Sequence, residues 1–499
     1  MKQKKANSLQ EALDDPKGTS ELCIHQSPMV VFPVGIAQLT NLRKLEITAC
    51  QLKSFPLSIC KLKELEVLIL SGNALEELPF ELAYLKRLQQ IDLSGNAFQK
   101  FPRALMGLNR LERIDLQDNP IKILPKTIVK LVNLKRLDMS HNRLTKIPDS
   151  ITSMRNLETL LFNRNNIKEF PEGVEGLTRI KKIHLNKNKL TTLPENMGTC
   201  ETLLVLEVAN NKLTHLPDSI GGCTALIKLI APKNALKKLP PSIIKLKLLQ
   251  ELNVSSNEIE AIPEGISSWQ FLKELNLAKN NIAVLPTGIS ALKDLHTLNL
   301  RGNQLEDLPG GMHQLKKLQE INLEENPMEL LPEVMLQLPW LKSIKLPRGL
   351  RDHRNLYKFF KKCIKAALPE EYYKPFYQVF IEKPRSVEVI EINMLLYALR
   401  FPDLAIREWG RAQFFGKYEK PPSEKTLISR SEFVLLGRAM SDRSNLKEIL
   451  QKRGVTYAKK VSPKTTHIVL GIAPFVEKSF LELPVVFLRE EELSGFLNS

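Results

Sequence analysis

The chain has 499 residues, of which 43% are hydrophobic, so it can bury a large core and is expected to form more than one domain. No segment approaches the roughly 20 consecutive apolar residues that cross a membrane. Residues 1–18 are charged and lack the apolar segment of a secretory signal, which predicts a cytoplasmic protein. The formal net charge of +17 permits binding to an acidic protein, a nucleic acid or an anionic surface. Because the lysines are spread along the chain, a solvated surface explains most of them.

Residues 1–21 form the first predicted segment. Their composition favours either a mobile segment or a cap, in which a short helix around Leu9–Leu13 covers the end of the next domain.

A repeat of 23 residues follows. Asparagine recurs once in every repeat, and a proline follows six residues after each asparagine, as in Asn142 and Pro148. The asparagines of this series are Asn73, Asn96, Asn119, Asn142, Asn165, Asn188, Asn211, Asn234, Asn257, Asn280, Asn303 and Asn326. A fixed period of this length indicates a solenoid built from stacked supersecondary units.

The apolar pattern between the asparagines resembles the leucine-rich repeat. One copy reads Leu131, Leu134, Leu137, Met139, Asn142, Leu144, Ile147, Pro148 and Ile151. The resemblance covers residues 22–349 and implies a solenoid of about 14 coils, whose short parallel strands form a curved sheet. We expect the asparagines to form a structural ladder, because a side-chain amide both donates and accepts hydrogen bonds and so satisfies several buried backbone groups. The proline suits the start of the convex segment, because it fixes φ.

The cysteines are expected to be reduced. No disulfide-rich cap and no CxxC pair occurs, so we predict no metal site and no cofactor. Cys200 and Cys223 lie one period apart and therefore stack in neighbouring coils. One interpretation is that they form a disulfide or bind a metal ion. We favour the other, that they are two small apolar core residues.

Repeat phasing identifies the strand residues that face away from the core. Along the chain they form three groups, with apolar residues at a few positions. The groups are an acidic ladder (Asp92, Asp115 and Asp138), a basic strip (Arg164, Lys182, His184, Lys187, Lys228 and Lys233) and an asparagine ladder from Asn253 to Asn322. Repulsion between the carboxylates of the acidic ladder is tolerable if Arg113 and Arg136 alternate with them. The residues that we predict to contact a protein partner are Ile69, Asp92, Asp115, Asp138, Leu161, Arg164, Lys182, His184, Lys187 and Ile230. The alternative is an ordinary polar sheet face, on which Asp and Asn side chains pair laterally.

The repeat stops at Gly349, and the composition changes. Residues 352–367 place apolar residues at helical spacing with basic residues between them, and two further helical stretches follow. We interpret residues 350–416 as a helical connector that packs its apolar face on the last coil, with membrane or partner binding as the alternative. Residues 417–431 are predicted to be a linker.

Residues 432–499 are predicted to form a small α/β domain. Strands are expected near Phe433–Leu436, Val455–Val461, His467–Leu470 and Val485–Leu488, with helices between and after them. This order, and the segments FVLLG, KRG, VSPKTTHIVLG and LPVVFL, resemble a BRCT domain of the kind found in NAD-dependent DNA ligases. In phosphate-binding members of that family a Ser or Thr precedes the glycine after the first strand, and a lysine of the second helix helps to hold the phosphate. Here Leu436 precedes Gly437, although Lys478 could match the lysine, so the resemblance favours an adaptor or self-association role.

The fold class is therefore α/β: a leucine-rich repeat horseshoe, a helical connector and a BRCT-like domain. The favoured function is a non-enzymatic scaffold that binds one protein on the concave face and a second partner, or another copy of itself, through the BRCT-like domain. A nucleic-acid-associated factor is the alternative that the basic charge suggests. A more remote alternative is a ubiquitin-ligase-like effector with Cys363 as nucleophile. The sequence predicts no catalytic residue and leaves the oligomeric state open.

Overall fold

The computed structural model describes residues 4–27 and 34–329, part of the stretch 332–347, and four short strands between residues 432 and 489. The chain divides into two compact units, Met1–Pro327 and Met328–Ser499. The predicted helical connector (350–416), the linker (417–431), Cys363, Lys478 and the helices expected in the C-terminal domain all lie outside the described residues.

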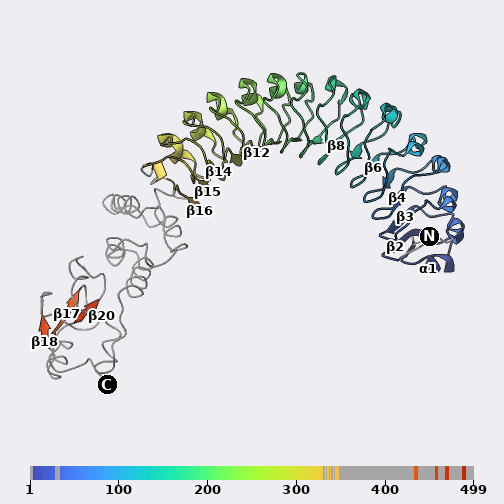
Figure 1. Cartoon of the computed structure of the whole chain (residues 1–499), viewed down its shortest axis with the longest axis horizontal. Coiled ribbons are helices and arrows are strands. Elements are labelled where there is room, and N and C mark those ends of the chain that lie inside the picture. Colours follow the sequence, from blue (N-terminus) through green and yellow to red (C-terminus); the bar gives the residue numbers. More distant parts are fainter. Residues whose placement is uncertain are drawn as a thin grey trace. The chain divides into compact units, whose positions relative to one another are not determined.

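In the first unit, strands β1 to β15 lie in one parallel sheet in the order of the chain (Figure 1). The strands are β1 (Lys4–Ala6), β2 (Thr19–His25), β3 (Lys44–Thr48), β4 (Val67–Ile69), β5 (Gln90–Asp92), β6 (Arg113–Asp115), β7 (Arg136–Asp138), β8 (Thr159–Leu161), β9 (Lys182–His184), β10 (Val205–Glu207), β11 (Lys228–Ile230), β12 (Glu251–Asn253), β13 (Glu274–Asn276), β14 (Thr297–Asn299) and β15 (Glu320–Asn322). The predicted horseshoe sheet is therefore confirmed.

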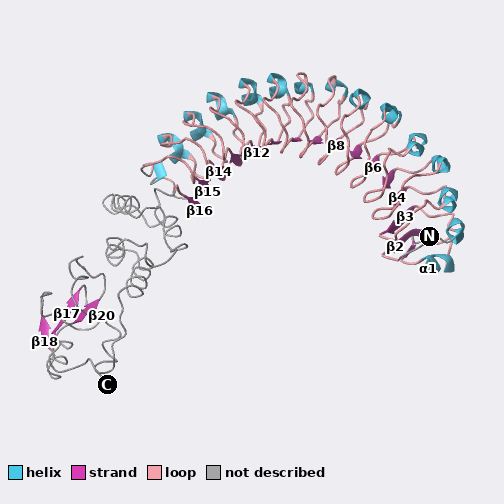
Figure 2. Cartoon of the chain, in the orientation of Figure 1, coloured by secondary structure: helices cyan, strands magenta, loops and turns pink. Residues whose placement is uncertain are grey.

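Short 3-10 helices form the outer side of the arc, and the strands form its inner, concave side (Figure 2). The 3-10 helices are η1 (Val34–Gln38), η2 (Leu57–Lys61), η3 (Phe80–Tyr84), η4 (Arg103–Gly107), η5 (Lys126–Lys130), η6 (Asp149–Ser153), η7 (Val174–Gly176), η8 (Met197–Thr199), η9 (Asp218–Gly222), η10 (Pro241–Lys245), η11 (Glu264–Ser268), η12 (Thr287–Ala291) and η13 (Gly310–Gln314). Proline precedes most of them: Pro148 has φ −69° before η6, and its carbonyl accepts from the backbone N–H of Ile151.

The core lies between the strands and the 3-10 helices. In β7 and the residue after it, Leu137 and Met139 are fully buried, as their alternation predicts. Leu131 and Leu134 close the same coil from the outer side. Cys200 and Cys223 are buried and free, and their thiols contact backbone carbonyls.

The asparagine ladder connects each coil to the one before it. Asn142 Nδ2 lies 2.8 Å from the carbonyl oxygen of Leu116 and 3.1 Å from that of Met139, and Asn142 Oδ1 accepts from the N–H of Ile121 at 3.1 Å. Every ladder asparagine repeats the bonds to residues 26 and 21 positions earlier. The amides of these residues thus bond backbone groups of their own coil and of the preceding coil.

The sheet begins upstream of residue 22, because β1 pairs with β2 in parallel. Between them lies α1 (Leu9–Asp14), whose N-cap Ser8 accepts a hydrogen bond from the N–H of Glu11. Ala12 of this helix is buried.

In the second unit, β16 (Ser343–Lys345) is followed by a separate four-stranded sheet. Its strands are β17 (Glu432–Leu436), β18 (Thr456–Ala458), β19 (His467–Leu470) and β20 (Val486–Arg489), in the order β18-β17-β19-β20, and all three pairs are parallel. Each strand lies on a segment predicted to be a strand, so this part of the α/β assignment is confirmed.

Candidate functional site

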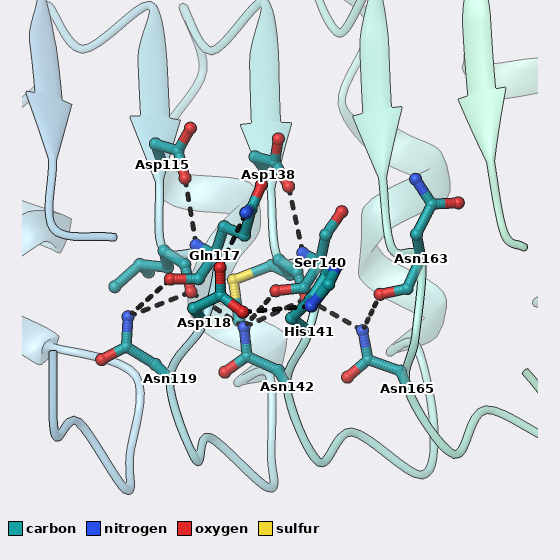
Figure 3. A network of polar contacts seen from close by, with 12 residues as sticks. Asp115, Gln117, Asp118, Asn119, Asp138, Ser140, His141, Asn142, Asn163 and Asn165 are labelled. Carbon is teal, nitrogen blue, oxygen red and sulfur yellow. Dashed lines mark hydrogen bonds and ion pairs between the residues drawn. The ribbon is translucent and has the colours of Figure 1, made fainter. Parts of the chain in front are cut away.

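The last residue of each short strand occupies the centre of the concave face, and we call it the central position. In β5–β7 and β12–β15 this residue is Asp or Asn, and its Oδ1 accepts the backbone N–H two residues further along, at 2.9–3.3 Å. Figure 3 shows two of these bonds, from Gln117 to Asp115 and from Ser140 to Asp138. Such a bond closes the turn that follows the strand. Asp and Asn side chains at the central position thus form hydrogen bonds within their own coil, rather than with side chains of the neighbouring strands.

The acidic ladder has the predicted register, since Asp92 pairs with Asp115 and Asp115 with Asp138. Asp138, expected to be exposed, is buried at 3% exposure, and Arg136 forms an ion pair with it at 3.0 Å. Burial raises the pKa of Asp115 to about 6; the N–H of Gln117 opposes this shift, and the charges of Asp138 and Asp92 add to it. These three side chains are therefore fixed by local structure.

The turn pattern is interrupted in four consecutive coils. The central positions of β8–β11 hold Leu161, His184, Glu207 and Ile230. Leucine, histidine and isoleucine offer no side-chain carboxyl or amide oxygen to the following turn, and Glu207 makes other contacts. In these coils another acceptor must bond the backbone N–H group that an Asp or Asn side chain bonds elsewhere.

Two asparagine side chains act as the acceptors in two of these coils. Asn163 Oδ1 accepts the N–H of Asn186 at 2.9 Å, and Asn186 Oδ1 accepts the N–H of Ala209 at 2.7 Å. In the β11 coil the corresponding residue is Pro232, which has no N–H to satisfy. The central positions of β9–β11 are thereby released from the turn and display other side chains.

Replacement of Asn186 by alanine tests this arrangement. We expect Asn186→Ala to lower the free energy of unfolding by about 1–3 kcal/mol, because the buried N–H of Ala209 loses its acceptor. Urea unfolding of the full-length protein measures the change. The control is Asn133→Ala, which removes an exposed bond to the carbonyl of Asn109 and should change stability by less than about 0.5 kcal/mol. Equal effects of the two substitutions would contradict the assignment.

We define the β8–β11 surface as the outward residues of these strands and of the turns that follow them. Its charged residues are the cations Arg164, Lys182, Lys187, Lys228 and Lys233 and the carboxylate Glu207. Lys228 pairs with Glu251 at 2.6 Å. The other four cations are exposed and make no ion pair within the part of the chain that the structure describes. The surface therefore presents unneutralised positive charge.

His184 and Glu207 lie together at the middle of this surface. Asn186 Nδ2 donates to Glu207 Oε2 at 2.6 Å, and His184 Nδ1 lies 3.5 Å from the same oxygen. Burial holds the pKa of His184 below its ordinary value, although Glu207 opposes the shift. Among the described residues, His184 Nε2 has no hydrogen-bond partner. His184 is thus neutral at neutral pH and adds no positive charge.

The residue before each ladder asparagine adopts a left-handed conformation, which the sequence did not predict. Arg164, Lys187 and Lys233 have φ of 53°, 56° and 55°, whereas Gly72 and Gly302 occupy equivalent positions in other coils. This conformation is unfavourable by roughly 1 kcal/mol for residues with a β-carbon. Basic side chains thus occupy positions where glycine would be unstrained.

The structure brings together five of the predicted contact residues, on the neighbouring coils of β8 and β9: Leu161, Arg164, Lys182, His184 and Lys187. Ile230 lies two strands beyond β9, and Ile69 lies on β4, on the far side of the acidic ladder. The roles of Asn163, Asn186 and Pro232 were not predicted from the sequence. The available signal was their position, two residues after a central position that lacks Asp or Asn.

No group of three His, Cys, Asp or Glu residues within the described residues is arranged to hold a metal ion. In that part of the chain, no helix combines the length and the apolar character needed to cross a bilayer.

Comparison with known proteins gives two families. The sequence model of the leucine rich repeat matches residues 40–98, 63–121, 100–144, 110–167, 132–190 and 270–328. That of the BRCA1 C Terminus (BRCT) domain matches residues 424–487, which begin within the predicted linker. A comparison with the curated proteins gives no match.

Several solved structures share the solenoid fold. A leucine-rich repeat protein from Leptospira interrogans is 29% identical, with a TM-score of 0.65 over 72% of this chain and 99% of that one. An internalin from Listeria monocytogenes is 19% identical, with a TM-score of 0.53 over 66% of this chain and 88% of that one. A receptor kinase from Arabidopsis, solved with a peptide hormone and a co-receptor, is 24% identical, with a TM-score of 0.55 over 69% of this chain and 64% of that one. The chain therefore contains leucine-rich repeats followed by a C-terminal BRCT domain.

Proposed function

We propose that this protein is a non-enzymatic scaffold that binds a protein partner on the concave face of its repeats, with the β8–β11 surface as the contact area. The observation that carries the proposal is the run of central positions at which Leu161, His184, Glu207 and Ile230 replace the turn-forming Asp or Asn. After β9 and β10 the side chains of Asn163 and Asn186 accept the turn N–H groups instead, and Pro232 after β11 has no N–H, so these turns are preserved while other side chains are displayed.

The composition of this surface supports recognition of a protein. Leu161 and Ile230 are partly exposed apolar side chains, and Val205 lies between them. Apolar residues surrounded by charged ones are typical of protein interfaces, in which a few anchors provide most of the affinity. Leucine-rich repeats and BRCT domains are both interaction modules, which favours a scaffold over an enzyme.

The remaining parts of the proposal concern the second unit and the compartment. We propose that residues 350–431 connect the repeats to the BRCT domain, which binds a second partner or another copy of this chain. The cysteines within the described residues are all free and buried, which supports a reducing compartment such as the cytoplasm.

Site-specific photo-crosslinking tests the contact area. A photoreactive amino acid is placed in the full-length protein at Val205, on the β8–β11 surface, or at the exposed Thr224 outside it. After nuclease treatment of a native extract, protein crosslinks should form from Val205 and not from Thr224. Crosslinks from Thr224 alone, or loss of all crosslinks on nuclease treatment, would overturn the proposal, and the latter would favour a nucleic-acid-associated function.

Leu161→Asn provides the matching substitution. Asparagine occupies the central position in β12–β15, so the coil should fold normally. We expect crosslinking from Val205 to fall about fivefold or more, which corresponds to loss of an apolar anchor worth about 1 kcal/mol. Val132→Asn removes an exposed valine outside the concave face and should leave crosslinking unchanged. Equal yields from the two variants would exclude Leu161 as an anchor.

A further inference from the structure

We infer that the β8–β11 surface binds an acidic, extended peptide segment of its partner. This inference rests on the proposed function and specifies the chemistry of the bound segment. Carboxylates of the segment would face Arg164, Lys187 and Lys233, and its aliphatic side chains would face Leu161 and Ile230.

The charge of the β8–β11 surface supports an acidic occupant. Glu207 is the one carboxylate of the β8–β11 surface, and Asn186 and His184 already contact it. Elsewhere on the concave face some cations are neutralised: Arg136 of β7 pairs with Asp138, and Arg301, which follows β14, pairs with Glu325. A partner segment that carries carboxylates would therefore find complementary charge on β8–β11, where four exposed cations lie on neighbouring coils.

Three of the cations on this surface form a row. Arg164, Lys187 and Lys233 occupy the same position in the coils of β8, β9 and β11. At about 4.8 Å per strand, the row is about 14 Å long. An extended peptide rises about 3.3 Å per residue, so four or five residues cross the row. Lys182, exposed on β9, adds a further cation to the same surface.

The residues of this row share a left-handed backbone conformation. The N–H groups of Arg164 and Lys187 each donate to a carbonyl of the next coil at 2.7 Å, which fixes the left-handed conformation. The coils of β4 and β5, which use Gly72 and Gly95 at this position, show that no side chain is needed for this turn. Asp118, His141 and Ser256 have the same conformation in other coils, so the strain belongs to the repeat, and what distinguishes this surface is that three of its four coils place a basic side chain there.

The surroundings favour an acidic peptide over a nucleic acid. No aromatic residue lies on the β8–β11 surface to stack on bases. Instead, Leu161, Val205 and Ile230 lie among the cations, and His184 is neutral at neutral pH. Apolar side chains beside cations match a segment that mixes carboxylates with aliphatic residues.

The test measures binding of a synthetic dodecapeptide to the full-length protein. The probe contains two glutamates for every leucine, and its control contains glutamine in place of glutamate. We expect the glutamate peptide to bind, the glutamine peptide to bind at least tenfold more weakly, and Arg164→Gly with Lys187→Gly to weaken the glutamate peptide about tenfold. These glycines suit the left-handed positions, so thermal stability should be retained or raised.

The charge-matched control is Lys237→Ser with Lys238→Ser, two exposed residues outside the concave face, and it should leave peptide binding unchanged. Equal weakening by both double variants would overturn the inference, as would equal affinity for the two peptides. Tighter binding of a single-stranded oligonucleotide that displaces the peptide would also overturn it. If the double glycine variant still crosslinks to protein from Val205 as the unaltered protein does, the scaffold proposal stands and the acidic-segment inference fails.

Discussion

Asn142→Asp is expected to lower the free energy of unfolding of the repeats by about 3–5 kcal/mol. Asn142 Nδ2 donates to the carbonyl oxygens of Leu116, Met139 and Ser140, and its Oδ1 accepts the N–H of Ile121. Aspartate has almost the same shape and keeps the acceptor. It places a buried carboxylate oxygen against three carbonyl oxygens, however, so it must either remain charged without donors or take up a proton.

The control is the same substitution at another asparagine of the same sheet. Asn253 occupies the central position of β12, where its Oδ1 accepts from the N–H and the hydroxyl of Ser255. Aspartate already makes the equivalent pair of bonds at Asp92, with Ser94. Asn253→Asp should therefore change stability by less than about 0.5 kcal/mol.

Urea unfolding gives the two free energies, and hydrogen exchange localises the damage. In Asn142→Asp, protection should fall first at Ile121 and in the coils of β6 and β7, because neighbouring coils stabilise one another. If Asn142→Asp and Asn253→Asp have equal effects, the ladder side chains do not contribute the bonds that the structure assigns to them.

Asp115→Asn is expected to stabilise the protein at neutral pH and to remove a pH dependence. Burial raises the pKa of Asp115 to about 6, above the ordinary value of 3.8. A carboxyl group whose pKa is raised by folding favours the folded state fully below the unfolded pKa, and this contribution is lost as the pH rises through the folded pKa. Stability should therefore decline between about pH 4 and pH 6, by about 1–3 kcal/mol from this group.

Asparagine keeps the acceptor for the N–H of Gln117 without the charge, as asparagine does at the central positions of β12–β15. The difference in stability between Asp115→Asn and the unaltered protein should be small at pH 4 and reach about 1–3 kcal/mol at pH 7.5. Asp115→Ala separates charge from turn formation: it should be less stable than Asp115→Asn by about 1 kcal/mol at both pH values. A stability difference that does not change with pH would show that Asp115 is not destabilised by its charge.

Within the repeats, much of the architecture was predictable because each coil uses the same solution to the same problem. An isolated coil cannot bury Leu137 and Met139, and it leaves backbone groups unpaired where the strand turns. Only a few residue types solve this, so asparagine and proline recur at a fixed spacing, and that spacing specifies strand, turn and convex segment together. The C-terminal strands were also predictable, from short apolar runs bounded by glycine and proline.

The candidate site was only partly predictable, because the period identifies which residues face outward but not what each side chain contacts there. Asp92, Asp115 and Asp138 have the sequence signature of a binding ladder, yet each closes its own turn, and Asp138 is buried. Arg164 and Lys187 were expected at the site, but their strained backbone was not.

The sequence by itself determined the repeat, its register and the inward and outward faces, since these depend on local periodicity and on hydrogen-bonding groups present in every coil. Tertiary structure alone decided which central positions are released from closing the turn. That freedom depends on whether a side chain of the preceding coil, as Asn186 does for Ala209, accepts the backbone N–H of the next turn. Hydrogen bonds between coils join residues about 23 positions apart. A pattern within one coil therefore does not show which of two available acceptors bonds a buried backbone N–H group.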